Sequence, residues 1–336
     1  MIREAINLII QNISLSEAEM AECMNEIMEG RATDAQIGAF LTALRIKGET
    51  VEEITGAARI MREKATKIKA PEGVVDTCGT GGDMSNTFNI STTSALVVAA
   101  AGVPVAKHGN RSVSSKSGSA DVLEALGVKI DLTPEKVEKC LFDTNFGFLF
   151  APLFHPAMKF AVGPRREIGI RTVFNILGPL TNPAGARRQV LGVFSSRLTE
   201  TLASVLGKLG ASDCMVVHGE DGLDEITACD GSRISRYRNG FVDTFYITPE
   251  DFGFNRHDRS FLLGDGGDVN ARIALSILNG EQGPRREIVL MNAAAALVVA
   301  GREDDLVSAK DVAAEIIDSK KAIEKLEEII KVTKSL

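Results

Sequence analysis

Two segments rich in glycine and hydroxyl residues could hold a phosphorylated ligand. The first, 76–83, follows a predicted strand and leads through Ser, Thr and Asn residues into a predicted helix. The second, 107–121, also follows a predicted strand and carries three cations, one His, one Asn and five Ser. Glycine lets the backbone approach a ligand, and hydroxyls and helix N-terminal amides bind phosphate oxygens. Together the segments predict a substrate with more than one phosphate, with a helix-capping turn and a solvated loop as the simpler alternatives.

The first segment departs from two common nucleotide motifs. Met84 stands where G-x-G-x-x-G requires its third glycine, and G-x-x-x-x-G-K-[ST] is not matched. Neither dinucleotide binding nor a P-loop therefore follows from it. The four histidines lack metal-ligand spacing and no G-x-S-x-G is present, so a hydrolytic triad finds no support.

Charged residues mark two further segments. Arg165 and Arg166 could hold a carboxylate through bidentate hydrogen bonds, although a solvated position on a helix explains them equally well. Asp224 and Glu225 lie in a glycine-containing loop after a predicted strand. They are candidate Mg²⁺ ligands, because Mg²⁺ takes few carboxylates and shares substrate phosphates, and a merely solvated acidic loop is the alternative.

Composition narrows the class of partner and the compartment. Lys and Arg number 38 against 45 Asp and Glu, a net charge of −7, and aromatic residues make up 5% with no Trp. These values disfavour nucleic-acid binding through a basic face or a stacking platform. The five scattered cysteines suit a reducing cytosol. The longest apolar stretch, 95–106, is about half a membrane span, so we expect a soluble cytoplasmic protein that does not bind a membrane.

The elements that must position these residues fall into two regions. Residues 1–65 show helical periodicity only, with capping boxes at Ser16 with Glu19 and at Thr50 with Glu53. After Lys67 short apolar runs alternate with helices, which predicts an α/β sheet with crossover connections. The region from about 269 to 336 is predicted mostly helical. Predicted strands are 103–106, 128–130, 146–150, 190–194 and 214–218, and predicted helices between them include 92–101, 120–126 and 199–209.

Several motifs, in order along nearly the whole chain, resemble the anthranilate phosphoribosyltransferase family of tryptophan biosynthesis. They are GTGGD at 79–83, NIST at 89–92, KHGNRSVSS at 107–115, GSADVLEALG at 118–127, RTVFNILGPLTNPA at 171–184 and LDE at 223–225. The resemblance implies a glycosyltransferase that moves the phosphoribosyl group from phosphoribosyl pyrophosphate to the amine of anthranilate. It implies an α/β fold with a small N-terminal all-helical domain and a large α/β domain with a mostly parallel central sheet, joined by hinges. The helical domain would span 1–70 and gain a later helical segment near 165–185, the α/β domain would span 71–336, and the helical domain would form a homodimer.

The same resemblance implies roles for individual residues. Anthranilate would contact Gly79, His108, Asn110 and Arg165, and Mg²⁺ would bind Ser91, Asp224 and Glu225. No residue is assigned as a sole general acid or base. Phosphoribosyl pyrophosphate would contact Gly79, Gly82, Asp83, Thr87, Asn89, Ile90, Ser91, Thr92, Lys107, His108, Gly109, Asn110, Arg111, Ser112, Val113, Ser114, Ser115 and Ser119.

Two rival functions remain testable. A pyrimidine nucleoside phosphorylase of the same architecture would use inorganic phosphate, but neither the KHGNR string nor the metal-binding LDE is expected there. A nucleic-acid-binding paralogue should carry a basic surface, against which the net charge of −7 speaks.

Overall fold

The computed structural model describes residues 1–112 and 116–336. Its N-terminal region is helical, as predicted, and the capping boxes at Ser16 and Thr50 are both confirmed. A third box, Thr33 with Gln36, begins another helix in the same way. The apolar stripes of these helices pack on one another around a shared core. The helices are α1 (Ile2–Ile10), α2 (Glu17–Met28), α3 (Asp34–Lys47) and α4 (Val51–Lys64).

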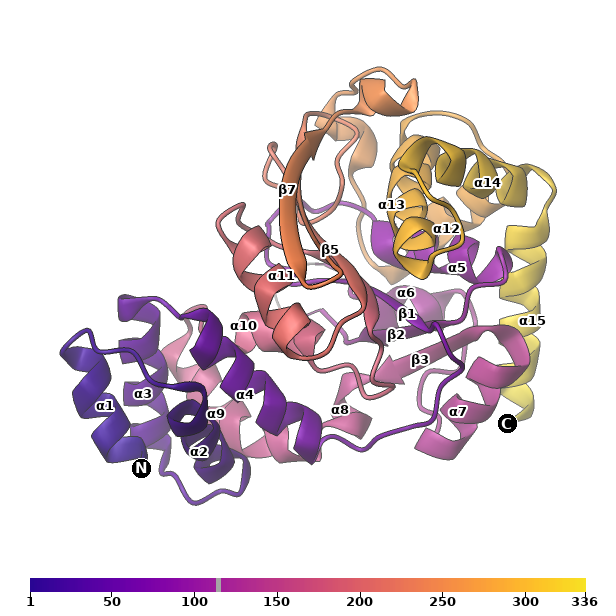
Figure 1. The fold of residues 1–336 in the computed structure, drawn as a ribbon. Helices are drawn as coiled ribbons and strands as arrows, with labels where there is room; N and C mark the ends of the chain where they lie inside the picture. The colour runs from indigo at the N-terminus through magenta and orange to yellow at the C-terminus, as the bar shows by residue number, and fades with distance from the viewer. Residues whose placement is uncertain (113–115) are drawn as a thin grey trace.

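A seven-stranded sheet forms the centre of the remaining chain (Figure 1). Its strand order is β3-β2-β1-β4-β5-β6-β7, with the first five strands parallel and the last two antiparallel. The chain moves outward from β1 in one direction and from β4 in the other, so the topological switch point lies between these two strands. The strands are β1 (Val75–Gly79), β2 (Val105–Gly109), β3 (Phe146–Phe150), β4 (Arg188–Gly192), β5 (Asp213–Gly219), β6 (Ser232–Arg238) and β7 (Phe241–Ile247).

Two features of the sheet differ from the sequence prediction. The predicted strand 128–130 is wrong: Val128 and Ile130 are buried in the core as irregular chain, and the Lys129 amide bonds the hydroxyl of Thr333 instead of a neighbouring strand. The hairpin of β6 and β7 was not predicted. Its turn, Asn239–Gly240, has both residues at positive φ, +53° and +88°. An Asn-Gly pair is the strongest short hairpin signal, so it could have been found.

Helices cover both faces of the sheet. Helices α5 and α13 pack on one face together with α14 and α15, while α11 and α4 lie on the other (Figure 1). The remaining elements are α5 (Ile90–Ala100), α6 (Ser119–Ala125), α7 (Pro134–Thr144), α8 (Ala151–Phe154), η1 (Pro156–Met158), α9 (Lys159–Ile168), α10 (Phe174–Leu177), η2 (Gly178–Leu180), α11 (Leu198–Lys208), η3 (Pro249–Phe252), η4 (Arg259–Leu262), α12 (Gly267–Leu278), α13 (Pro284–Ala300), α14 (Leu306–Asp318) and α15 (Lys321–Ser335).

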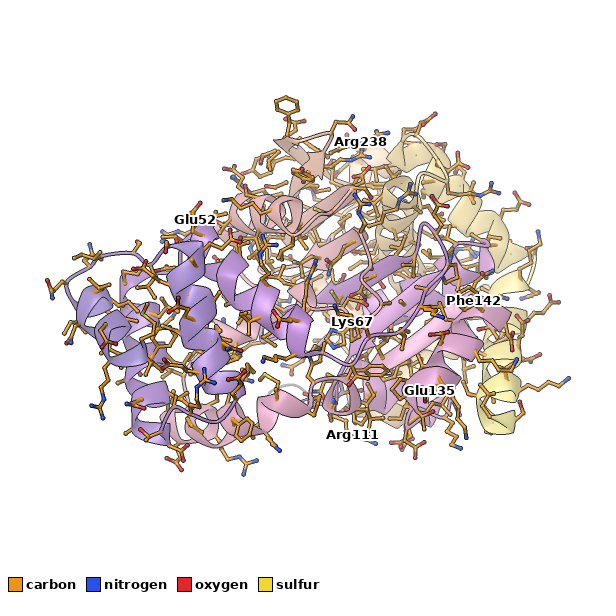
Figure 2. All side chains as sticks on the ribbon, turned by 60° about the horizontal axis from the view of Figure 1, so that its bottom comes forward. Glu52, Lys67, Arg111, Glu135, Phe142 and Arg238 are labelled. Atoms are coloured by element: carbon orange, nitrogen blue, oxygen red, sulfur yellow. The ribbon has the colours of Figure 1, made fainter. Side chains whose placement is uncertain are left out.

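The later helices α9 and α10 return to the N-terminal region. Helix α9 contacts α2 and α3, α10 contacts α4, and their buried side chains share one hydrophobic cluster with α1 to α4. Lys67, just after α4, lies where the chain passes from these helices to the sheet (Figure 2). None of the helices in the described part of the chain is both long and apolar enough to cross a membrane.

Candidate functional site at the switch point of the sheet

Asp224 lies over the carboxyl ends of β1 and β4. Gly79 and Gly192 are the last residues of these strands and are paired in register. A Cβ at Gly79 would lie 2.4 Å from Asp224 Oδ2, and one at Gly192 would lie 1.6 Å from the Asp224 carbonyl oxygen. Both strands therefore need glycine where they end, since any side chain there would collide with Asp224. Ligands of open α/β sheets bind in this crevice, so the acidic loop occupies the expected place.

Three carboxyl groups share this buried region. The amide of Gly81 donates to Asp224 Oδ2 at 2.8 Å, and the amide of Ser91 donates to Glu225 Oε1 at 3.1 Å. Asp83 follows in the same glycine loop, with Oδ2 3.5 Å from the Asp224 amide nitrogen. Burial raises the pKa of Asp224 well above its usual range, and the charges of Asp83 and Glu225 raise it further. Burial likewise raises the pKa of Glu225 to about 7.

The residues around Asp224 fit a divalent cation that is shared with a ligand. Crowded, desolvated carboxylates repel one another, and a cation between them would relieve that cost. Within residues 1–112 and 116–336, however, no three His, Cys, Asp or Glu side chains are placed to hold a metal ion by themselves. Mg²⁺ commonly binds one or two carboxylates and completes its shell with water and substrate phosphates. The arrangement suits such an ion better than a closed metal centre.

The glycine loop after β1 turns its backbone through conformations that few side chains allow. Gly81 and Gly82 have φ of +65° and +73°, and Met84 and Asn86 follow at +58° and +54°. Successive residues of this kind can present their amides as an anion-binding concavity. The guanidinium of Arg171, which follows α9, donates to the carbonyl of Gly82 and so helps to hold the glycine loop in this conformation.

Helix α5 begins where the glycine loop ends. Its N-cap, Asn89, makes no side-chain hydrogen bond to the helix, unlike the boxes that cap α2 to α4. The hydroxyl of Thr92 in the first turn is buried and unpaired among the described residues, as is that of Thr172. Buried hydroxyls without partners are rare, so each needs an explanation. Oxygens of a bound phosphate at this helix end would supply one for Thr92.

Lys107 brings a buried positive charge under the same helix end. Its Nζ donates to the Thr77 carbonyl at 2.5 Å and to Ser91 Oγ at 3.4 Å. Burial lowers the Lys107 pKa, while the carboxylates of Asp76 and Glu225 act in the opposite direction. A cation held here favours a negatively charged ligand at the end of the sheet.

The second segment is only partly gathered at this site. A Cβ at Gly109 would meet Ser119 Oγ at 2.1 Å, so β2 ends tightly against the start of α6. Arg111 is turned elsewhere: it pairs with Asp121 at 2.9 Å and Glu124 at 2.8 Å, and it lies at the border of the molecule in Figure 2. The anion-binding role expected for Arg111 would require these ion pairs to open. The expected ligand contacts of 113–115 lie outside the described residues.

A pair of buried histidines lies at the end of β2. His108 Nε2 and His155 Nε2 are 3.1 Å apart, and the backbone of Gly178 also hydrogen bonds His108. Burial, aided for His108 by its neighbour His155, lowers the pKa of His108 to about 3, and burial lowers that of His155 to about 4. Both rings are therefore neutral at physiological pH. Nothing in the surroundings of His155 along the chain marks it as the partner of His108.

Arg165 is a half-buried cation available to a carboxylate. It lies on α9 with its guanidinium carbon 5.0 Å from the ring centroid of Phe174, and burial lowers its pKa. Its guanidinium makes no hydrogen bond or ion pair with any part of the chain that the structure describes. Its neighbour Arg166 is exposed to solvent. The two arginines are thus distinguished by burial, which their adjacent positions in the sequence could not reveal.

The structure brings together several of the residues singled out from the sequence. Gly79, Ser91, Lys107, Asp224 and Glu225 converge at the switch point. The side chain of Ile90 belongs to the hydrophobic core, which leaves only its backbone for a ligand. Arg171, Thr172 and His155 were not predicted as site residues. Arg171 and Thr172 begin the motif RTVFNILGPLTNPA, but their contacts depend on how the chain folds back from α8 to η2.

Comparisons with known proteins agree with this geometry. Residues 3–65 match the helical bundle domain of a glycosyl transferase family, and residues 71–323 match its a/b domain. The anthranilate phosphoribosyltransferases of Acetivibrio thermocellus and Desulfosudis oleivorans are 54% and 56% identical to the chain, covering all of it and 97% and 99% of the relatives. The solved anthranilate phosphoribosyltransferase of Thermus thermophilus is 41% identical, with a TM-score of 0.93 over 98% of this chain and 99% of that one.

A second solved relative carries ligands. The anthranilate phosphoribosyltransferase of Saccharomyces cerevisiae in complex with PRPP and Mg is 28% identical, with a TM-score of 0.91 over 100% of this chain and 98% of that one. The fold, the residues at the switch point and these likenesses over full length lead to one conclusion. The chain belongs to the anthranilate phosphoribosyltransferase family.

Proposed function

We propose that this protein transfers the 5-phosphoribosyl group from phosphoribosyl pyrophosphate to the amine of anthranilate. The products are N-(5-phosphoribosyl)anthranilate and pyrophosphate, in a step of tryptophan biosynthesis. The observation that carries the proposal is the adjacent pair of half-buried Asp224 and buried Glu225 above the paired glycines that end β1 and β4. That pair lies beside a glycine loop and the start of α5, whose N-cap side chain makes no capping bond, and together these suit a diphosphate and its cation.

Phosphoribosyl pyrophosphate is proposed to bind along the two loops after β1 and β2. The unpaired Thr92 hydroxyl and the buried charge of Lys107 support this placement. The ligand set is the one expected from the sequence: Gly79, Gly82, Asp83, Thr87, 89–92, 107–115 and Ser119.

Mg²⁺ is the proposed cofactor, held by Ser91, Asp224 and Glu225. The solved yeast relative with PRPP and Mg supports its use in this family. When bound, Mg²⁺ would neutralise the negative charge that grows on the departing pyrophosphate. The chain positions the ligands for it: the amides of Gly81 and Ser91 hold Asp224 and Glu225 in place.

Anthranilate is proposed to bind between Arg165 and the end of β2, with contacts from Gly79, His108 and Asn110. A solved yeast relative in complex with 4-fluoroanthranilate, 27% identical with a TM-score of 0.89, supports a ligand of this kind. The guanidinium of Arg165, unpaired among the described residues, can donate two hydrogen bonds to the carboxylate.

The reaction needs orientation more than proton abstraction. The aromatic amine of anthranilate is already neutral at pH 7, so we propose that no single residue is an indispensable general base. His108 is neutral and already hydrogen bonded to His155 and Gly178. Holding the amine in line with C1 of the ribose supplies much of the acceleration. The charge of Lys107 and the loop amides stabilise the leaving group.

The larger organisation is proposed on the same basis. Residues 1–70 together with a segment near 165–185 would form the helical domain, and 71–336 the α/β domain. Packing of α9 and α10 on α2 to α4 supports this division. We also propose a homodimer formed through the helical domain, and a cytoplasmic location. All five cysteines, each within the described residues, are free, as a reducing compartment allows.

The test is a comparison of two reactions by mass spectrometry. The enzyme is incubated with anthranilate, phosphoribosyl pyrophosphate and Mg²⁺, and separately with thymidine or uridine and inorganic phosphate. Formation of phosphoribosylanthranilate in the first reaction alone supports the proposal. Release of a free base in the second, with none of the first product, would replace it by nucleoside phosphorolysis. A gel shift at physiological salt, expected to show no binding, tests the nucleic-acid-binding alternative.

A further inference from the structure

Asn270, on helix α12, is buried at 1% exposure and far in sequence from both ligand-binding loops. Its Nδ2 donates to Asn89 Oδ1 at 2.9 Å, and its Oδ1 accepts from the amide of Asp265 at 2.8 Å. The side-chain amide of Asn89 in turn donates to the carbonyl of Ser117 at 3.3 Å. Asn270 and Asn89 therefore join three separate segments: the start of α5, the end of the second loop and the start of α12.

The chain before α12 is also bound to the glycine loop. Thr87 forms a β-bridge with Leu263, and the amides of Phe88 and Gly264 bond the carbonyls of Leu262 and Asn86. The space around Asn270 is full, because a Cβ at Gly264 would lie 2.4 Å from Asn270 Oδ1. The side-chain amide is thus fixed in one orientation by the backbone that surrounds it.

This arrangement changes what Asn89 does. Asn89 is the N-cap of α5, and an N-cap asparagine ordinarily turns its side chain back onto the first helical amides. Here the side chain makes no capping bond, because Asn270 and Ser117 hold it away from the helix. The amide of Ser91 in the first turn already donates to Glu225, so an outside anion at this helix end would meet the remaining first-turn groups, beginning with Thr92. The buried, unpaired hydroxyl of Thr92 in the same turn is a second sign that the partner comes from outside the described chain.

We infer that Asn270 is a positioning residue that holds Asn89 off the N-terminus of α5 and so keeps this helix end open for the pyrophosphate of the substrate. The inference rests on the proposed function for the identity of the anion. Asn270 itself touches neither reacting group; it acts only through Asn89. Loss of its Nδ2 donor leaves the Asn89 side chain held by Ser117 alone, and a side chain held less firmly can turn toward α5 and compete with the anion.

The test compares two substitutions that separate this role from a structural one. Asn270→Leu removes both hydrogen bonds at similar size, whereas Asn270→Asp keeps the acceptor for Asp265, loses the donor to Asn89 and adds a negative charge, whose direct repulsion of the anion is measured by repeating the titrations at high salt. The inference predicts that both variants raise the KM for phosphoribosyl pyrophosphate by about 5- to 30-fold, as expected for losing a favourable helix-end interaction with an anion. The KM for anthranilate should stay within about twofold. Asn279→Leu is the control, since Asn279 lies at the exposed C-terminus of the same helix and its side-chain amide bonds the Leu275 carbonyl, away from both loops.

Binding of inorganic pyrophosphate by calorimetry, with Mg²⁺ present, separates the two claims. If the wild-type protein shows no transferase activity, the proposed function fails, while weaker pyrophosphate binding by Asn270→Asp still supports the positioning role. If the wild-type protein is active and Asn270→Asp keeps its KM for phosphoribosyl pyrophosphate and its pyrophosphate affinity, the inference is wrong. An equal loss for both substrates would also overturn it. Asn270→Asp retains the α12 contact, so it serves as the decisive variant if Asn270→Leu does not fold.

Discussion

Gly79→Ala is a small change aimed at one carboxylate. The new methyl group would lie 2.4 Å from Asp224 Oδ2 and 3.1 Å from its Cγ, with the Asp224 carbonyl oxygen next at 3.5 Å. Contacts below 3.0 Å do not persist, so the carboxylate must move by at least 0.6 Å, the difference between 3.0 and 2.4 Å. This displacement lengthens and weakens the 2.8 Å hydrogen bond from the Gly81 amide. The main chain at Gly79 can stay where it is, because its φ lies outside the left-handed region.

We expect Gly79→Ala to slow catalysis and to weaken Mg²⁺ binding. A displacement of about 1 Å in an active site can cost about 100-fold, so we expect kcat/KM to fall by about 10- to 100-fold and the Mg²⁺ concentration for half-maximal activity to rise. The assay is initial rate against Mg²⁺ concentration, with the melting temperature measured in parallel. Gly38→Ala is the control: Gly38 lies within α3 with open space around its Cβ position, and alanine should stabilise the helix by about 1 kcal/mol.

A second variant distinguishes displacement of the Asp224 side chain from displacement of its main chain. In Gly192→Ala the methyl group would lie 1.6 Å from the Asp224 carbonyl oxygen, so the main chain itself must shift. That protein should lose stability as well as activity. If Gly79→Ala keeps wild-type activity and an unchanged Mg²⁺ requirement, the placement of Asp224 at the working end of the sheet is refuted.

Three further predictions concern other parts of the site. Arg165→Lys should raise the KM for anthranilate about 10-fold in steady-state assays, because lysine cannot make the bidentate hydrogen bonds of arginine to a carboxylate. The KM for phosphoribosyl pyrophosphate should stay within about twofold. Equal changes in both KM values would contradict the placement of Arg165 at the anthranilate carboxylate. Asn292→Leu should raise the Mg²⁺ concentration needed for half-maximal rate. The Asn292 side chain bonds both the amide and the carbonyl of Ile226, at 3.0 and 2.8 Å, and Ile226 directly follows Asp224 and Glu225. An unaltered Mg²⁺ titration would show that Asn292 does not position this loop. His155→Gln should lessen the fall in melting temperature between pH 6.5 and 4.5. The pKa of His155 in the folded protein is lowered from 6.5 to about 4, so the unfolded chain binds more protons between these pH values. The free energy of unfolding therefore drops as the pH falls, by up to about 3 kcal/mol at about 1.4 kcal/mol per pH unit. A variant with the wild-type pH profile would count against a neutral His108–His155 pair.

Local patterns in the sequence predicted much of the fold. The boxes at Ser16 and Thr50 begin helices because their partners lie three residues away, within the reach of a periodicity argument. The strand at 146–150 was predicted with its observed bounds. The segment 128–130 failed because buried apolar residues need not pair as a strand.

The contacts that complete the site were out of reach of such patterns. His155 meets His108 across 47 residues, and Asn270 meets Asn89 across 181. These contacts depend on where whole helices pack, and single side chains carry no sign of them in the sequence. The motifs indicated which loops carry chemistry, whereas the orientation of Arg111 away from the site and the burial of Arg165 required the folded chain.

The most direct test follows the fluorescence of anthranilate with the enzyme, phosphoribosyl pyrophosphate and Mg²⁺. We expect a decay that requires all of these components, stops when EDTA is added and resumes with excess Mg²⁺. The same decay should be strongly reduced in Asp224→Asn, a variant of equal size that lacks the carboxylate charge. Unchanged fluorescence from folded wild-type protein under these conditions would contradict the proposed transfer.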